Sequence, residues 1–421
     1  MDDLTPDFSF IDFGFNKKYN FLMLFKFSAY GFLKNFKFFD PFFLLFFLSK
    51  GLSYTEVGIL ISIREIFVNI FEIPSGIFAD MFSKRKAMLV CFASFIASFL
   101  IIHNAYNYYY LILSMIFFGL GEAFRTGTHK AIILDYLELN NMLDKKLEYY
   151  GTTRSWSQIG AALSSLIAGI LVFYSNNYDY IFIASIIPYI TGFILILTYP
   201  EYEKTCENRC FSMHIKSFYS EIFSKKIGKI VINSAFFEAV FKSVKDYIQP
   251  VIKSSIPVLF AASAINDTRK TALFISVFYF IIYILSSFSS KNVNKTLNRF
   301  KISDNHALNL SFVFFTISVI FAGLVNIKVS NFTLWLTVII FMMLYIIYNF
   351  RKPVIVSFYG KFMDKSHRAG VLSVDSQVKS VILMICAPLL GFLVDSYGIG
   401  YGMSIFGVSI LFLSFLVKFK D

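Results

Sequence analysis

The stretch EIPSGIFADMFSKRK, from Glu72 to Lys86, changes from apolar to strongly basic within a few residues. Its first half is mostly apolar, and its second half places Asp80 ahead of three consecutive bases, Lys84, Arg85 and Lys86. Long apolar runs lie on both sides of it. A short basic turn between two apolar runs is typical of a loop that joins two membrane-spanning helices.

The composition of the chain supports a membrane protein. Of its 421 residues 57% are hydrophobic and only 16% are charged, and the mean hydropathy is +0.64. Soluble domains carry about 25% charged residues. The formal net charge of +12 is spread over many short polar segments, which excludes a nucleic-acid-binding face and favours cytoplasmic loops. The four cysteines are too few and too scattered for a disulfide scaffold.

Apolar windows long enough to cross a bilayer recur along the whole chain. We therefore predict an all-α, polytopic membrane protein with twelve transmembrane helices. The spans are expected near residues 21–48, 55–78, 87–105, 108–134, 154–174, 180–199, 230–252, 271–289, 307–327, 331–350, 370–393 and 400–417.

The distribution of Lys and Arg predicts the orientation of these spans. If the N-terminus is cytoplasmic, every basic loop falls on the cytoplasmic side, as the positive-inside rule requires. The outer loops then hold only Lys50, Lys253, Arg269, Lys270 and Lys328. We expect a multi-pass protein of the bacterial inner or plasma membrane with both termini in the cytoplasm.

The longest polar interval follows the sixth span and divides the chain. It predicts an N-terminal six-helix half at 1–200, a cytoplasmic loop at 201–229 and a C-terminal six-helix half at 230–421. Two such halves around one loop are a recurring plan of secondary transporters, with the substrate path between the halves near the bilayer midplane.

Three stretches resemble the major facilitator superfamily. Gly76, Asp80, Lys84, Arg85 and Lys86 are similar to its signature between helices two and three, G-x-x-x-D-R-x-G-R-K/R. The segment GLGEAFRTGTHKAIILDYL, residues 119–137, resembles the helix-four region of one bacterial branch. The segment at 367–398 resembles the helix-eleven region of that branch, with its RAxxLS start and PxxGxxxDxxG finish.

The sequence departs from the family pattern at positions that bear on the cargo. Met81 and Ser83 replace an Arg and a Gly of the signature, and Met115 stands where many proton-coupled members carry an Arg. The fifth span also lacks the Gly-Pro pair of drug antiporters. These departures weaken, without removing, the hypothesis of a proton/drug antiporter.

The resemblance implies a gating role for the opening stretch. In this superfamily the acid of the hairpin holds the two halves together on the cytoplasmic side, with an acid at the end of helix four and the start of helix eleven. Carried over, this puts Asp80, Arg85 and Asp135 in one gating latch against the helix that starts near Ala369. The rest of the predicted latch consists of Gly76, Lys84 and Lys86.

Charged residues within the predicted spans are candidates for a substrate or proton site, because a charge at the midplane is costly. The resemblance places spans one, four, seven and ten around the central cavity, and three of these carry such charges. The candidates are Lys34, Lys37 and Asp40 on the first span, Glu122 and Arg125 on the fourth, and Glu238 and Lys242 on the seventh.

Each of these groups also has a structural interpretation. Glu122 and Arg125, three residues apart, can form an internal ion pair. Glu238 and Lys242, four apart, can pair near the outer interface and reach water. The charges of the first span can sit at a water-exposed mouth. Since buried carboxyls favour the neutral form, Glu122 and Glu238 are the candidates for proton coupling.

Other possible sites carry less weight. Cys206, Cys210 and His214 recur every four residues, as zinc ligands on a helix can, but they lack a fourth ligand. No Walker motif and no catalytic triad is present, so the sequence predicts neither an ATP-driven pump nor an enzyme, and no cofactor or metal.

The sequence thus predicts a monomeric secondary active transporter of a small molecule that works by alternating access. Proton-coupled export is the first hypothesis. Uptake or uniport of a polar metabolite is the second, and a non-transporting membrane partner with a transporter fold is the third.

Overall fold

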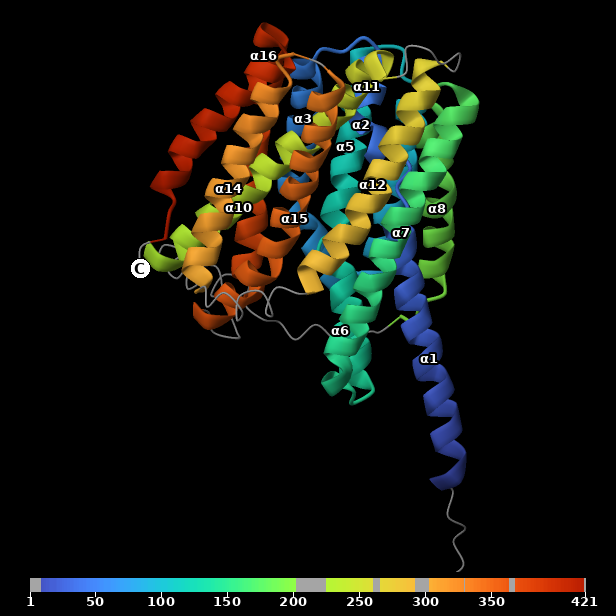
Figure 1. The fold of residues 1–421 in the computed structure, drawn as a ribbon. Coiled ribbons are helices and arrows are strands. Elements are labelled where there is room, and N and C mark those ends of the chain that lie inside the picture. The colour runs from blue at the N-terminus through green and yellow to red at the C-terminus, as the bar shows by residue number, and fades with distance from the viewer. Residues whose placement is uncertain are drawn as a thin grey trace, which may run out of the picture.

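The structure is a computed structural model, and it describes residues 9–201, 225–259, 266–291, 303–328, 330–362 and 368–419. Within these residues the ordered elements are all helical. Figure 1 shows them as one bundle of long, steeply inclined helices. The predicted loop at 201–229 lies mostly outside the described residues.

The helices before this gap are labelled as in Figure 1, where α1 continues into α2 and α5 into α6, and successive crossings alternate in direction. Their bounds are α1 Ser9–Lys34, η1 Asp40–Phe42, α2 Phe43–Ser49, α3 Tyr54–Met81, α4 Lys84–His103, α5 Tyr108–Arg125, α6 Thr128–Leu139, η2 Leu143–Lys145, α7 Lys146–Ser175 and α8 Tyr180–Leu197.

The helices after the gap continue the alternation. Their bounds are α10 Lys225–Val244, η3 Lys245–Tyr247, α11 Ile248–Leu259, α12 Asp267–Lys291, α14 Asp304–Val325, α15 Asn331–Phe362 and α16 Arg368–Leu416. The last of these contains two crossings, because Gly398 has a φ of +79° and breaks the helix between them. All twelve predicted spans therefore correspond to helices.

Seven stretches of the described residues are long and apolar enough to cross a membrane by length and composition. They include the two crossings of α16 and so account for eight of the twelve spans. The other four spans, on α1–α2, α3, α5–α6 and α10–α11, each carry two or more charged residues or a break in the helix. The departures from a plain apolar helix are thus concentrated on these four spans.

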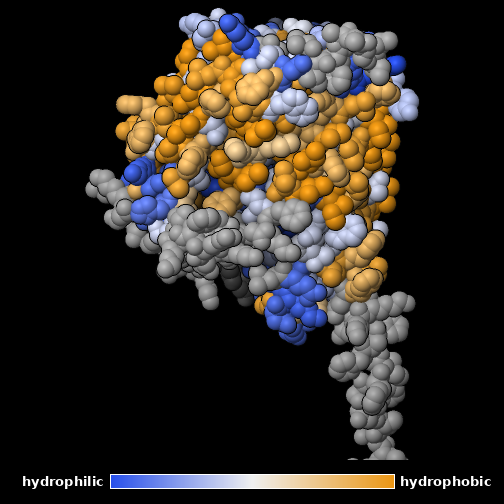
Figure 2. Space-filling model, in the orientation of Figure 1, coloured by the Kyte–Doolittle hydropathy of each residue, from blue (hydrophilic) through white to orange (hydrophobic). Residues whose placement is uncertain are grey.

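The surface has the profile of a membrane protein. Figure 2 shows a broad hydrophobic band around the middle of the bundle, with hydrophilic residues towards both ends. We call these ends the α6 end, where α6 and residues 197–201 lie, and the α2 end, where α2 and residues 49–54 lie. Large apolar side chains such as Ile187 and Ile385 are 68% and 65% exposed, as lipid-facing residues are.

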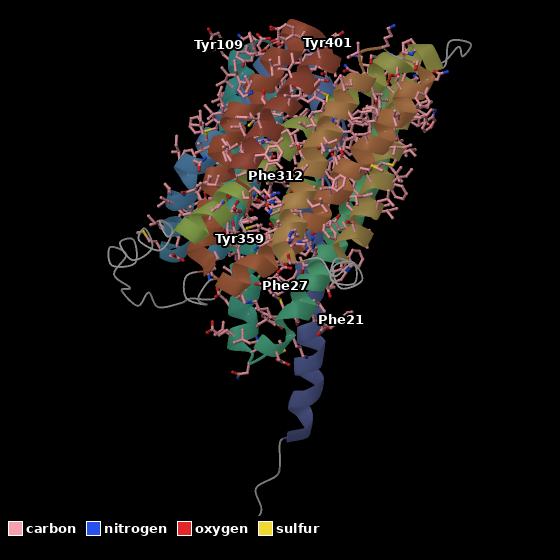
Figure 3. All side chains as sticks on the ribbon, turned by 60° about the vertical axis from the view of Figure 1, so that its left-hand side comes forward. Phe21, Phe27, Tyr109, Phe312, Tyr359 and Tyr401 are labelled. Carbon is pink, nitrogen blue, oxygen red and sulfur yellow. The ribbon has the colours of Figure 1, made fainter. Side chains whose placement is uncertain are left out.

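Aromatic residues mark the boundary of this band at the α2 end. Tyr109 and Tyr401 lie there (Figure 3), and they are 78% and 54% exposed. Tyr106, Tyr174 and Tyr180 are exposed at neighbouring helix ends. Tyrosine is enriched where hydrocarbon meets water, because its ring is apolar and its hydroxyl is polar.

Two helix pairs join α1–α8 to α10–α16: α3 packs along α16, and α7 packs along α12. Glycine allows the close approach of the first pair. A Cβ atom on Gly58 of α3 would lie 2.6 Å from the carbonyl oxygen of Ala387, and one on Gly391 of α16 would lie 2.4 Å from that of Tyr54. The backbones of α3 and α16 are therefore in contact at these two points.

Candidate functional site

Two helices are interrupted at corresponding places in the first and second sets of helices. The first span stops at Lys34, turns, and resumes as η1, where Pro41 lies at the start of the new helix. The seventh span changes from α10 through η3, Lys245–Tyr247, to α11. Matching interruptions in two halves are the usual position of a transporter's binding site, because they free backbone and polar groups inside the membrane.

Charged side chains gather around these interruptions. We call them the interior charge cluster. Its members on α1, the turn after it, η1, α3 and α5 are Lys34, Lys37, Asp40, Arg64, Glu65, Glu122 and Arg125; those on α10, η3 and α16 are Glu238, Lys242, Lys245, Asp246 and Lys379. All are buried or half-buried. The structure thus brings together all seven residues of the predicted substrate site and adds five more.

An ion pair joins the two interruptions directly. A carboxylate oxygen of Asp40 lies 3.7 Å from Nζ of Lys245, which also lies 2.8 Å from Asp246. The hydroxyl of Tyr283 donates to Asp40 at 2.8 Å. Asp40 therefore connects the first span to both the seventh and the eighth span.

The side chain of Gln249 completes this junction. Its Oε1 accepts hydrogen bonds from the backbone N–H groups of Leu44, at 3.0 Å, and Leu45, at 3.3 Å. Its Nε2 donates to the carbonyl of Asp40. These bonds satisfy backbone groups that the interruption of the first span leaves without helical partners.

A second junction lies on α3 and was missed from the sequence. Arg64 pairs with the adjacent Glu65 at 2.7 Å, and the hydroxyl of Ser380 on α16 donates to Glu65 at 2.6 Å. Two adjacent opposite charges within the apolar run ISIREIF are the signal that could have identified them.

Glu122 and Arg125 form the ion pair that their spacing allowed. The Arg125 guanidinium also lies over the ring of Phe95, with its carbon 5.7 Å from the ring centroid. Glu122 is within electrostatic range of Lys37, Arg64 and Lys242. Glu122 therefore lies among cations from the turn after α1, from α3 and from α10.

Glu238 pairs differently from the sequence expectation. Its partner is Lys379 on α16, at 3.6 Å, and the hydroxyl of Tyr348 on α15 donates to it at 3.3 Å. The expected partner, Lys242, lies on the same helix but makes no ion pair with it among the described residues. The reason is that Glu238 faces α15 and α16, where a cation and a hydroxyl are both in reach.

Three lysines of the cluster have no carboxylate partner. Within the described part of the chain, the ammonium groups of Lys34, Lys37 and Lys242 have no carboxylate oxygen within 4.0 Å. Lys34 lies over the ring of Tyr30 at 5.7 Å and Lys37 over that of Phe39 at 5.9 Å. These distances are at the limit of a useful cation–π contact.

Among the described residues, the contacts of the predicted latch residues lie at the α6 end and within the first set of helices. Lys84, at the start of α4, pairs with Asp135 of α6. Arg85 and Lys86 each lie 3.9 Å from Glu201, which also accepts a hydrogen bond from Ser83 at 2.8 Å. Glu201 was not anticipated, because it follows the sixth span and is far from the hairpin in sequence.

The description covers the other parts of the predicted latch only in part. Asp80 is exposed on the last turn of α3. At Gly76 nothing lies within 4 Å of the position of a Cβ atom. The residues 363–367 and the side chains of 368–373, which include the expected contact near Ala369, are outside the described part of the structure.

No group of three His, Cys, Asp or Glu side chains in the described residues is arranged to hold a metal ion. Cys206, Cys210 and His214, the possible zinc ligands of the sequence, lie outside these residues.

Comparison with known proteins places the chain among membrane transporters. Residues 27–298 match the family model described as Major Facilitator Superfamily. A curated Bacillus subtilis (strain 168) protein, YxaM, described as an uncharacterized MFS-type transporter, is 21% identical over 404 residues. The match covers 91% of this chain and 92% of YxaM.

Solved structures share the fold at low sequence identity. The nucleoside transporter NupG matches with a TM-score of 0.74 and 15% identity, covering 94% of this chain and 99% of its own. A D-xylose-proton symporter matches with a TM-score of 0.69 and 13% identity, covering 95% and 97% of the two chains.

Proposed function

This chain belongs to the major facilitator superfamily, and from that premise we propose that it is a secondary active transporter working by alternating access. The two halves, 1–200 and 230–421, rock against each other around the interior charge cluster. The observation that carries the proposal is the position of this cluster. It contains charges from both halves, and it surrounds the interruptions of the first and seventh spans.

The cost of burying charge supports a functional cluster. A single charged side chain at the centre of a membrane helix costs about 2.5–3.5 kcal/mol on insertion scales. The cluster holds twelve charged residues. A helical bundle does not need ion pairs of this kind to hold it together. Apolar residues of the same size pack at least as well as buried ion pairs. We propose that these charges are retained because they bind cargo and coupling ions.

The basic residues support an orientation. Lys84, Arg85, Lys86, Lys145 and Lys146 all lie at the α6 end. The positive-inside rule then places this end in the cytoplasm of a bacterial cell, with the α2 end outside. The described hydrogen bonds and ion pairs between the halves join residues between Asp40 and Glu65 in the first half to residues between Lys245 and Asp395 in the second half. They favour a state that is closed at the α2 end.

Proton coupling is proposed to act through Glu122 and Glu238. Both carboxylates are paired with cations on neighbouring turns or helices, so protonation of either one releases a cation and changes the attraction between helices. Exchange of protons for cargo leaving the cell is the direction that the sequence predicts.

The test is proton flux in proteoliposomes loaded with a pH dye, using a panel of sugars, nucleosides, amino acids, peptides, carboxylates and drugs. Glu122→Gln and Glu238→Gln are expected to lower cargo-dependent proton flux at least tenfold. Glu148→Gln, on the exposed start of α7, is the matched control and is expected to behave as the native chain.

Three outcomes argue against parts of this proposal. Labelled cargo that equilibrates without proton movement shows a uniporter or another coupling ion. Inward cargo movement with protons shows uptake. Complete absence of transport by the folded protein favours a non-transporting membrane partner.

A further inference from the structure

We propose that the cargo is a small organic anion, bound through its carboxylate or phosphate oxygens by Lys34, Lys37 and Lys242. This inference rests on the proposed transport function and adds the chemical class of the substrate. The geometry that carries it is the pairing pattern within the interior charge cluster.

All five acids of the cluster already have a cation. Arg64 holds Glu65, Arg125 holds Glu122, Lys379 holds Glu238, and Lys245 lies between Asp40 and Asp246. Four bases therefore account for five carboxylates. A cationic cargo has to displace one of these bases before it reaches a carboxylate, and the displaced base is then left buried and unpaired.

The remaining three bases have no such partner. Within the described residues Lys34 and Lys37 lie over aromatic rings, and none of the three lysines has a carboxylate oxygen within 4.0 Å. An ammonium group without a close carboxylate and away from bulk water is unfavourable, and the three lysines lie beside the interruptions that the Asp40–Lys245 pair joins. An anion with two or three oxygens offsets this cost, and a lysine ammonium can turn to meet it as a point charge.

The three lysines come from both halves of the molecule. Lys34 ends α1 and Lys37 lies in the turn between α1 and η1, and Lys242 lies in the last turn of α10, just before the interruption of the seventh span. Lys37 lies three residues before Asp40 and Lys242 three residues before Lys245, and Asp40 and Lys245 form an ion pair, so the two sides meet at one junction. An anion bound there touches both halves, which is the requirement for cargo that controls a rocking motion.

The binding test uses purified full-length protein and probes that differ only in charge. Succinate is compared with succinamide, glucose 6-phosphate with glucose, and benzoate with benzamide, with choline as a cation, at millimolar concentration. Thermal unfolding measures binding, since a ligand of the folded state raises the Tm. At least one anion is expected to raise the Tm while its neutral partner and choline do not.

Variants locate the anion. Lys34→Gln, Lys37→Gln and Lys242→Gln are each expected to raise the apparent Kd of the stabilising anion about tenfold, the usual effect of losing one hydrogen bond to a charged group. The corresponding Arg variants keep the charge and are expected to restore much of the affinity. Lys253→Gln, exposed on α11, is the matched control and should leave the Kd unchanged.

The outcomes separate this inference from the proposed function. An anion that binds through the lysines but is not moved in proteoliposomes supports the inference and contradicts transport. Transport of a neutral or cationic probe supports transport and overturns the inference. Stabilisation by no anion, or stabilisation that the three Gln variants leave unchanged, also overturns it.

Discussion

At the scale of single residues, Asp395 closes the α2 end by capping a helix of the other half. Its two carboxylate oxygens accept hydrogen bonds from the backbone N–H groups of Tyr54, at 3.0 Å, and Thr55, at 2.7 Å. The next N–H, of Glu56, is bonded to the hydroxyl of Ser53. The backbone N–H groups in the first turn of α3 therefore all have hydrogen-bond acceptors, and α16 supplies some of these acceptors. Negative charge is also favourable at a helix N-terminus.

This contact predicts the effect of removing the carboxylate. Asp395→Ala is expected to lower the free energy of unfolding by about 1 kcal/mol, as the loss of a helix cap does, and to loosen the α2 end. Differential scanning fluorimetry measures the first effect, and thiol labelling of a cysteine placed at Tyr54 measures the second. Asp144→Ala, on the exposed η2, is the control. Equal Tm and labelling for both variants would contradict the role of Asp395 in closure.

At the scale of elements, the contact between α3 and α16 depends on small residues at fixed positions. The stretch that resembled PxxGxxxDxxG acquires a physical explanation here. Gly391 lets α16 touch the backbone at Tyr54, Asp395 caps α3, and Gly398 allows the reversal between two crossings because its φ is positive. This one motif thus provides the close approach of α16 to α3, the cap of α3 and the turn between the two crossings of α16.

A glycine substitution tests this approach. Gly58→Ala is expected to lower the Tm and the transport rate, because its Cβ would lie 2.6 Å from the backbone of Ala387 and Pro388. Gly151→Ala, in α7, has nothing within 4 Å and is expected to keep or raise the Tm, since Ala favours a helix by up to about 1 kcal/mol over Gly. A similar Tm for the two variants would show that α3 and α16 do not rely on backbone contact.

The elements were predictable from the sequence for a simple reason. Apolar runs of bilayer length, and basic loops on one side of the membrane, are local signals in the sequence. They were enough to predict the positions of all twelve spans. The interruptions were not predicted. Asp40 and Pro41 are a local signal for the first, but η3 contains no proline or glycine that could signal the second.

Many members of the interior charge cluster were predictable from the sequence, but of their partners only the Glu122–Arg125 pair was. A charged residue in an apolar run marks a position where burying the charge is costly, whatever its partner is. Lys34, Glu122 and Glu238 could therefore be selected as candidates from the sequence. Partners from distant helices leave no spacing signal. This is why Glu238 was expected beside Lys242 and lies beside Lys379, and why Glu201 was missed beside Arg85.

At the scale of the whole molecule, alternating access depends on one mechanical feature. The halves are joined towards the α2 end by Asp40–Lys245, by the Asp395 cap and by stacked rings of Tyr54 and Tyr247, whose centroids are 5.6 Å apart. Alternating access requires these contacts to break and re-form in every cycle.

The most direct measurement is therefore transport with the α2 end held shut. Tyr54→Cys and Tyr247→Cys, in a chain with Cys206→Ser and Cys210→Ser, are joined by a short, reducible thiol cross-linker in proteoliposomes. Cross-linking is expected to stop cargo-dependent flux and reduction to restore it, while either single cysteine treated in the same way keeps its flux. Undiminished flux through fully cross-linked protein would contradict alternating access by separation of the halves at the α2 end.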